Sequence, residues 1–295
     1  MDKIVIGFGE LLWDMLPSGK QIGGAPGNFA FHAAQSGMNS CVISAVGTDA
    51  GGDELFDAAE EHELCLVAER NDKPTGTVDV VLDDCGVPQY VIHENVAWDY
   101  IPFTWEEETL ARKAETFCFG TLVQRSDESR TTLLHLLDVM NPDALKVFDV
   151  NLRQNFYDEE IILQSLSRCN VLKLNEDEVK IMGHLLGGDV TNVQHFCECL
   201  LRDYNLKVII LTCGERGSYV FTDTEKSYLK TPAVNVVDTV GAGDSFTSAF
   251  CAACMMGKSL QEAHCLAVEV SAFVCTQPGG MPVWPQELKN KFSNR

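Results

Sequence analysis

Short runs of β-branched and apolar residues recur along the chain, separated by stretches in which apolar residues return with the 3.6-residue period of a helix. The runs that most clearly predict strands are Ile4 to Gly7, Cys41 to Val46, Thr116 to Phe119, Leu145 to Val150, Val171 to Leu174 and Lys207 to Leu211. Apolar strands that alternate with helices are typical of a mostly parallel sheet with helices on both faces. The pattern therefore predicts a three-layer α/β/α sandwich, in which ligands bind beyond the carboxyl ends of the strands.

Residues 75–96, TGTVDVVLDDCGVPQYVIHENV, depart from this alternation. Apolar and polar residues alternate on both sides of a turn at Asp83 to Gly86, with no helical stretch between them, so this segment predicts two paired strands. We expect a small accessory sheet that acts as a lid over a site or as a dimerisation surface. A plain surface hairpin is the alternative.

Length and composition narrow the class of protein. The 295 residues are 45% apolar, which is enough to bury a large core, and no low-complexity tract or fixed repeat divides them. We expect one domain over residues 1–295 with an elaboration. No long apolar segment follows the opening charges and no run of about 18 apolar residues occurs, so we expect a cytoplasmic protein without a membrane partner.

The net charge of the chain limits the classes of partner that it can bind. The chain has 22 basic and 43 acidic residues, a formal net charge of −21, which repels phosphate backbones and anionic membranes. Nucleic acid is therefore not an expected partner. A polyanionic substrate would need local help from a cation such as magnesium, from an arginine or from backbone amides.

The 12 cysteines are spread through apolar segments. Cys251 and Cys254 form a CxxC, and Cys197 lies close to Cys199, but neither a second pair nor a histidine cluster completes a metal site. We expect reduced residues that pack in the core.

The most informative short stretch is DTVGAGDSF, residues 238–246, which precedes an apolar helical stretch. The amides of Gly241, Ala242 and Gly243 at a helix N-terminus would form an anion site. The carboxylate of Asp244 beside them could accept a proton from an attacking hydroxyl. Phosphoryl transfer to an alcohol needs this pairing, although an aspartate that only caps the helix is the alternative.

Other phosphate and nucleophile motifs do not fit. GKS at 257–259 resembles the end of a P-loop, but Ala252 stands at the first required glycine and the stretch follows a helix. GFGELL resembles a dinucleotide fingerprint, but Leu12 stands at the third glycine. Ser245 has no GxSxG elbow around it, which disfavours a hydrolase.

Five motifs in order resemble the PfkB family of carbohydrate kinases, which have a ribokinase-like fold, over essentially the full chain. GGAPGNFAFHAAQSGMNSCVISAVGTDAGGDEL is similar to the first signature of the family and VNVVDTVGAGDSFTSAF to the second. FDVNLRQNF, LKLNEDEV and LTCGERGSYV are similar to its internal elements. The resemblance implies a kinase that uses ATP and Mg²⁺ on a small-molecule sugar. A monovalent cation such as K⁺ often accompanies this family, near the segment that opens with Asp238.

The resemblance also implies roles for residues on the phosphate side. Asp244 would deprotonate the sugar hydroxyl, while the three preceding amides hold the transferred phosphoryl group. Asn175 and Glu178 would position hydrated magnesium and phosphates, and their i, i+3 spacing places both on one face of a helix start. On their own, these two residues would be interpreted as an ordinary surface turn.

Further positions match the nucleotide and sugar sides of the family site. Thr212, Gly214 and Gly217 would line the ATP pocket, although a β-turn needs such glycines as well. Arg153 could reach phosphate or sugar oxygens, with a salt bridge as the alternative. The residues that would meet the hydroxyls of the sugar are Asp14, Gly23, Gly24 and Asn28, although Asn28 could instead simply start a helix.

The substrate follows from finer similarities. GFGELLWDMLP, PTGTVDVVLDDCGVPQYVI and FGTLVQRS look most like fructokinases, which favours fructose phosphorylated at a primary hydroxyl. The segment HENVAWDYI departs from the usual lid stretch, and its His93 and Trp98 could lie near the sugar. Ribose, 2-keto-3-deoxygluconate or a nucleoside therefore remain alternative substrates. Lid elements are expected at about 11–18 and 75–100, with a homodimer through the lid. A catalytically silent sugar-binding regulator is the alternative from another class.

Overall fold

The fold is organised around a nine-stranded sheet, described here from a computed structural model that covers residues 3–16, 19–82 and 88–293. The strand order is β13-β12-β11-β10-β9-β8-β1-β4-β5, and neighbours are parallel except at β11–β12 and β12–β13. The strands are β1 (Ile4–Phe8), β4 (Asn39–Gly47), β5 (Leu66–Asn71), β8 (Ala114–Phe119), β9 (Leu145–Asp149), β10 (Val171–Asn175), β11 (Val208–Thr212), β12 (Ser218–Phe221) and β13 (Lys226–Leu229).

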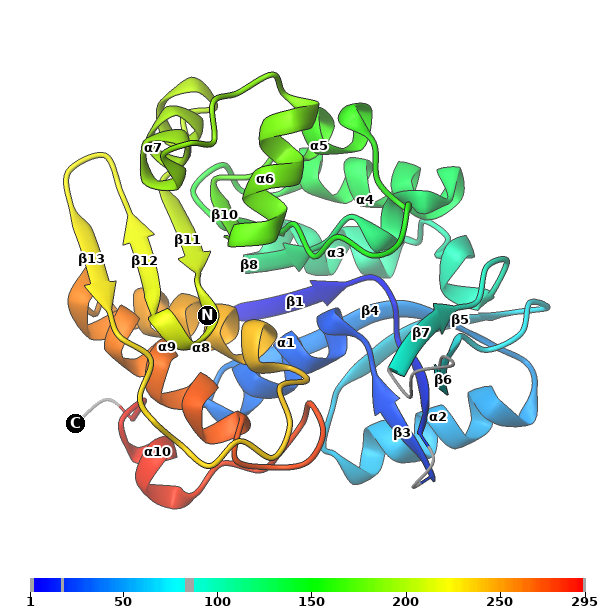
Figure 1. Cartoon of the computed structure of the whole chain (residues 1–295). Helices are drawn as coiled ribbons and strands as arrows, with labels where there is room; N and C mark the ends of the chain where they lie inside the picture. Colours follow the sequence, from blue (N-terminus) through cyan, green and yellow to red (C-terminus); the bar gives the residue numbers. More distant parts are fainter. Residues whose placement is uncertain (1–2, 17–18, 83–87, 294–295) are drawn as a thin grey trace.

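Helices cover both faces of this sheet (Figure 1). One layer holds α1 (Ala25–Gln35), α2 (Ala50–Glu61), α8 (Ala242–Met255), α9 (Leu260–Val274) and α10 (Gln286–Asn290). The other holds α3 (Trp105–Lys113), α4 (Asp127–Val139), α5 (Glu159–Leu166), α6 (Glu176–Leu185) and α7 (Val193–Asp203). In β1, Val5 packs into the core under α8 while Ile6 packs into the core on the opposite face, as a strand buried on both sides requires. The predicted three-layer architecture is confirmed.

All six strands predicted from the sequence are present, as β1, β4, β8, β9, β10 and β11. The strands that the pattern did not indicate lie toward the ends of the sheet. β5 is an edge strand that contains Glu69 and Arg70, and β12 with β13 forms an antiparallel extension. Edge strands bury less of their surface, so their apolar pattern is weak.

A second, four-stranded sheet has the order β3-β2-β6-β7. The predicted hairpin is confirmed as β6 (Thr77–Leu82) and β7 (Pro88–Ile92), while its turn at Asp83 to Gly86 lies outside the described residues. β2 (Leu12–Leu16) runs parallel to β6 and antiparallel to β3 (Gly19–Gly23). Asp14 lies on β2, which begins at Leu12, shortly after β1 ends at Phe8. Within the described part of the chain, no helix combines the length and apolarity needed to cross a membrane.

Candidate active site

Gly241 opens the turn that leads into α8. Its φ of 72° is left-handed, and a Cβ there would lie 2.7 Å from the carbonyl oxygen of Gly280, so only glycine fits. The N–H of Ser245 donates to the carbonyl of Gly241 at 2.8 Å and starts the helical hydrogen bonds. The three amides predicted to form an anion site thus lie at the first turn of a helix, where amides lack helical acceptors. The Ala242 amide donates to the Thr239 carbonyl at 3.3 Å within the turn.

Asp244 stands in the same first turn, two residues into α8. Its carboxylate accepts a hydrogen bond from Nδ2 of Asn28 at 2.8 Å, and the N-cap of the helix is Gly241, so Asp244 is not a plain helix cap. Burial raises the pKa of Asp244 to about 6, helped by the nearby Asp149 carboxylate and opposed by the Asn28 hydrogen bond and by Lys173. The result is a carboxylate that is more basic than a surface aspartate and still ionised at neutral pH.

A buried ion pair that sequence reasoning missed lies beside Asp244. Nζ of Lys173 is 2.9 Å from Oδ1 of Asp149, and both side chains are less than 10% exposed. Burial alone would lower the pKa of Lys173, but Asp149, Glu178 and Asp244 prevail and raise it above the usual range, so this lysine is a permanent cation. A Cβ at Gly243 would lie 3.0 Å from that Nζ, which explains a small residue there.

Asn175 and Glu178 form a capping box at the start of α6. Oδ1 of Asn175 accepts from the amides of Asp177 and Glu178, each at 2.9 Å. The two carboxylate oxygens of Glu178 accept from the amides of Asn175 (2.7 Å) and Leu152 (3.2 Å). Burial raises the pKa of Glu178, and the Lys173 ammonium opposes this. The expected shared placement at a helix start is confirmed, with the carboxylate held rigidly over the carboxyl ends of β9 and β10.

The residues predicted on the sugar side do come together. Asp14 lies so close to Gly23 that a Cβ on Gly23 would be 2.1 Å from its Oδ2. Gly24 has a φ of 117°, and a Cβ there would lie 2.2 Å from the carbonyl oxygen of Glu10. Both glycines therefore permit an approach that any side chain would block. Burial and the Asp238 carboxylate raise the pKa of Asp14 to about 6.

Asn28 connects the sugar side to the base. α1 begins at Ala25, so Asn28 lies inside its first turn and does not start the helix, contrary to the simpler alternative. Besides its bond to Asp244, Asn28 has a buried Oδ1 without a partner among the described residues. A buried amide oxygen that lacks a donor suits a ligand hydroxyl.

A strap formed by residues 277–285 backs this region. The carbonyl of Gly280 accepts from Nε2 of His32 at 2.9 Å, and Nε1 of Trp284 donates to Nδ1 of the same ring at 2.9 Å. His32 is fully buried, and burial lowers its pKa to about 4, so it stays neutral with its proton on Nε2. The strap thereby holds Gly280 against both Gly241 and Asn28.

Glu10 is a further buried acid that sequence reasoning missed. A narrow cleft at the strand ends is lined by Glu10, Pro26, Phe29, Asp149, Asn151 and Asp244, among others. Burial raises the pKa of Glu10 to about 7, while the charge of Arg153 lowers it. Arg153 is exposed, donates to the carbonyl of Leu152 at 3.0 Å and makes no salt bridge with a described residue. Within the described part of the chain, the salt-bridge alternative for this arginine is therefore not realised.

The predicted nucleotide residues follow β11. The sheet register pairs Thr212 with Asn175, so both lie at the same edge. Gly214 has a φ of 55° and Gly217 a φ of 131°, and a Cβ on Gly217 would lie 2.3 Å from the carbonyl oxygen of Leu229. These glycines have the conformations that the turn requires. They lie at the carboxyl end of the sheet, where the site was expected.

Trp98 and His93, which the lid stretch singled out, have different surroundings. Trp98 is fully buried in a cluster beneath the small sheet, with the guanidinium of Arg125 3.9 Å from its ring centroid and paired with Asp99. His93 bonds to Asp79 of β6 at 2.7 Å. Trp98 is therefore a core residue. In the sequence, nothing distinguished it from any other large apolar side chain.

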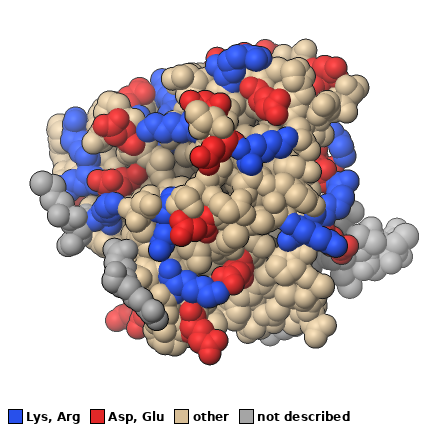
Figure 2. All heavy atoms as spheres, turned by 90° about the vertical axis from the view of Figure 1, so that its left-hand side faces the viewer, with Lys and Arg blue, Asp and Glu red and all other residues tan. Residues whose placement is uncertain are grey.

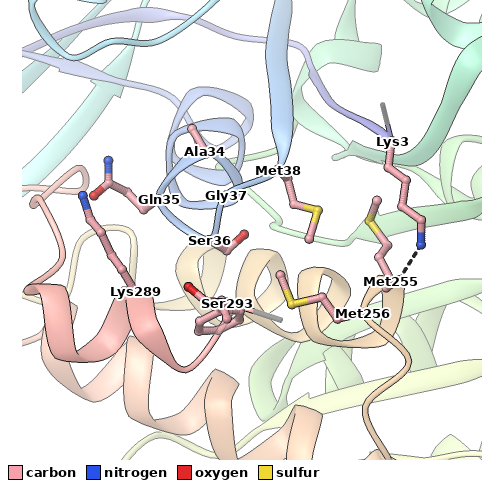
Figure 3. A pocket seen from close by; sticks show the side chains of 11 residues that line it. Lys3, Ala34, Gln35, Ser36, Gly37, Met38, Met255, Met256, Lys289 and Ser293 are labelled. Carbon is pink, nitrogen blue, oxygen red and sulfur yellow. Dashed lines mark hydrogen bonds between the residues drawn. The ribbon is translucent and has the colours of Figure 1, made fainter. Parts of the chain in front are cut away.

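A large cavity lies at the opposite end of the sheet (Figure 3). It has a volume of about 570 Å³ and is lined by the side chains of Met38, Met255 and Met256, with Lys3 at its edge. Lys3 and Met38 precede β1 and β4, and Met255 ends α8, whereas Asp244 begins it. Ligands of parallel sheets bind at the carboxyl ends of the strands, so size alone does not mark the reaction site.

Among the described residues, the face of the molecule that Figure 2 shows carries no broad cationic patch. Figure 2 shows the face that carries the β13 edge of the sheet, where basic and acidic side chains are interspersed. With a net charge of −21, a phosphorylated ligand must be met by local groups. The helix N-terminus at Gly241, Lys173 and Arg153 are such groups.

Comparisons with known proteins agree with this arrangement. Residues 17–287 match the pfkB family carbohydrate kinase. A probable fructokinase-5 of Arabidopsis thaliana is 28% identical over 96% of this chain and 94% of its own length. An ATP-dependent 6-phosphofructokinase of Thermoanaerobacterium thermosaccharolyticum is 27% identical over 91% and 87%, respectively.

Solved structures share the fold. A fructokinase with bound ATP from Xylella fastidiosa superposes with a TM-score of 0.85, at 22% identity, over 99% of this chain and 98% of that one. At this identity the likeness supports the ribokinase-like fold. The family match covers most of the sequence and includes the glycine turn, the capping box and Asp244. The chain therefore belongs to the pfkB family of carbohydrate kinases.

Proposed function

We propose that the protein transfers the γ-phosphate of ATP to a primary hydroxyl of fructose. The observation that carries the proposal is the position of the Asp244 carboxylate, in the first turn of α8 beside the glycine amides and within hydrogen-bond distance of Asn28. A proton acceptor and an anion site within one helical turn are the two groups that phosphoryl transfer to an alcohol requires. Fructose is favoured because fructokinases are among the relatives over nearly the whole chain.

In this mechanism Asp244 accepts the proton of the sugar hydroxyl as that oxygen attacks phosphorus. The amides of Gly241, Ala242 and Gly243, together with the dipole of α8, stabilise the negative charge on the phosphoryl oxygens. Lys173 offsets the repulsion that Asp149 would exert on the reacting phosphate. The proton stays on Asp244 until product leaves and then passes to solvent.

The residues at the strand ends fit ATP with magnesium. When bound, Mg²⁺ neutralises phosphate charge and aligns the phosphate chain. Both oxygens of Glu178 already accept main-chain hydrogen bonds, so this carboxylate suits a role through metal-bound water, with Asn175 beside it. Thr212, Gly214 and Gly217 would border the nucleotide. A monovalent cation such as K⁺ would lie near the segment that opens with Asp238.

On the sugar side, Asp14 and Asn28 would offer oxygens to the hydroxyls of fructose. Gly23 and Gly24 would let the sugar approach the backbone closely. Arg153 would orient oxygens of the sugar or of the phosphate. The small sheet would act as a lid and as the surface of a homodimer. Its strand β2 supplies Asp14 directly, so closing the lid would position the acceptor.

The proposal is tested by ADP release with ATP and magnesium, coupled to a spectroscopic readout, against fructose, fructose 6-phosphate, ribose, 2-keto-3-deoxygluconate and adenosine. We expect kcat/KM to be highest for fructose. A higher value for another acceptor would keep the kinase and replace the substrate. Absence of ADP release with every acceptor would favour a sugar-binding regulator instead.

Replacing Asp14 with asparagine is expected to raise KM for fructose about 10- to 100-fold with a smaller change in kcat, because a charged hydrogen bond to substrate contributes about 1.5–3 kcal/mol. Steady-state kinetics of Asp14→Asn measure this. Asp79→Asn, on the same small sheet and paired with His93, is the matched control and should leave KM unchanged. Equal effects of the two substitutions would remove Asp14 from the sugar site.

The raised pKa of Asp244 predicts the pH dependence of the reaction. Its base form prevails above about pH 6 and is lost as pH falls through that value, so kcat/KM should fall about tenfold per pH unit below it. Glu10, with a pKa of about 7, titrates nearby, so the profile is measured in the wild type and in Glu10→Gln. The assignment to Asp244 would be contradicted if the fall of kcat/KM at low pH disappeared in Glu10→Gln, or if its midpoint lay near pH 4.

A further inference from the structure

Two cysteines are neighbours on parallel strands far from the glycine turn in sequence. The register of β4 and β5 pairs Val42 with Leu66, and the amide of Val42 donates to the carbonyl of Cys65 at 2.9 Å. One residue earlier, Cys41 on β4 therefore lies next to Cys65, which immediately precedes β5. Neighbouring strands are about 4.8 Å apart, within the range of about 4.4–6.8 Å between Cα atoms that disulfides span.

Their side chains lie on the same face of the sheet. Val42 and Leu66 pack toward α1 and α2, while Ile43 and Val67 pack into the core on the other side. Because side chains alternate along a strand, Cys41 and Cys65 belong to the face of Ile43 and Val67. Cys41 is indeed part of that core, and the two thiols are close enough to shift each other's pKa.

The two thiols differ in access. Cys41 is 4% exposed, whereas Cys65 is exposed at the edge of the sheet, where β5 has no outer neighbour. Among the described cysteines, Cys118 also has a neighbouring thiol, Cys251, which raises its pKa, but both are buried in the core. The pair on β4 and β5 combines a reachable thiol with a second one in position to attack it.

We propose that Cys41 and Cys65 form an oxidisable dithiol, a modification site that hydrogen peroxide converts to a disulfide between β4 and the residue that precedes β5. The Cys65 thiolate attacks one peroxide oxygen, the O–O bond breaks, and the leaving hydroxide takes a proton to become water. The sulfur of Cys41 then attacks the resulting sulfenic acid, an S–S bond forms, and hydroxide leaves with the Cys41 proton as a second water. Two thiols are oxidised, and one peroxide is reduced to two waters.

The local chemistry favours this order of events. The interaction with the neighbouring Cys41 thiol lowers the pKa of Cys65, although burial and the Glu106 carboxylate oppose this. The same interaction and burial raise the pKa of Cys41. The exposed sulfur is therefore the first nucleophile and the buried one resolves the intermediate.

The test is to treat the wild-type protein with hydrogen peroxide, block free thiols after denaturation, and map peptides without reduction. We expect a cross-linked peptide pair that contains Cys41 and Cys65 and separates on reduction. Cys65→Ser should abolish it completely. Cys265→Ser removes another exposed thiol, on α9, and should leave it unchanged.

The proposal is overturned if Cys65 is carried on to sulfinic acid, or links to another cysteine, while Cys41 is recovered as the free, blocked thiol. Because the mapping uses the wild type, it does not depend on how well a core variant such as Cys41→Ala folds. It is also independent of kinase activity, so failure of the proposed function would leave this result standing.

Discussion

Replacing Asp244 with asparagine is expected to lower kcat about 10²- to 10⁴-fold while leaving the affinity for ATP and the fold nearly unchanged. The amide is the same size as the carboxylate, and its oxygen can still accept the hydrogen bond from Asn28. What it lacks is the capacity to take a proton from the sugar hydroxyl. Steady-state ADP release gives kcat, and calorimetric titration with ATP gives the affinity.

Asp127→Asn is the matched control, because Asp127 also occupies the first turn of a helix, α4, but is exposed on the surface beside Arg130. It should keep wild-type turnover. If Asp244→Asn also turned over near the wild-type rate, another group would have to be the base, and Glu10, which lines the same cleft, would be the next candidate.

Replacing Lys173 with methionine is expected to lower the free energy of unfolding by about 3–5 kcal/mol. The substitution keeps the apolar stem but leaves Asp149 buried without its cation, with Asp244 and Glu178 close by. Denaturant unfolding followed by circular dichroism measures the change. The loss should lessen at lower pH, because the stranded carboxylate can then be protonated.

The double variant Asp149→Leu/Lys173→Met separates this cause from lost packing. If the cost comes from an unpaired buried charge, removing that charge as well should restore most of the stability. A double variant as unstable as the single one would show instead that the lysine stem, rather than its charge, is what the core requires. Lys180→Met, at an exposed pair on α6, should change little.

Much of the fold could be predicted because its strands are buried on both faces and therefore continuously apolar. β1 and β11 are examples, since their residues contact helices above and below. β5 was missed for the opposite reason: at the edge of the sheet only part of it is buried, and Glu69 and Arg70 interrupt its pattern. β3 was missed because it opens with Gly19 and Lys20 on an exposed strand.

The candidate site was predictable where chemistry needs a local pattern. The glycine turn, Asp244 and the Asn175 to Glu178 spacing are each contained in a few consecutive residues. Glu10 and Lys173 were not found, because each is a single charge in an apolar run. Only the fold reveals that Glu10 lines the cleft and that Lys173 pairs with Asp149, another residue of its lining. A lone charge within a predicted buried strand, as in VLKLN, was the available signal.

The strap of residues 277–285 has a consequence for how the protein matures during translation. Gly241 packs against Gly280, and the carbonyl of Gly280 accepts a hydrogen bond from His32. A nascent chain that has emerged only as far as α9 therefore contains every residue assigned to catalysis but lacks the strap that packs against them. The catalytic turn is therefore completed only after the strap has also left the ribosome, and nascent chains that stop before the strap should not consume nucleotide.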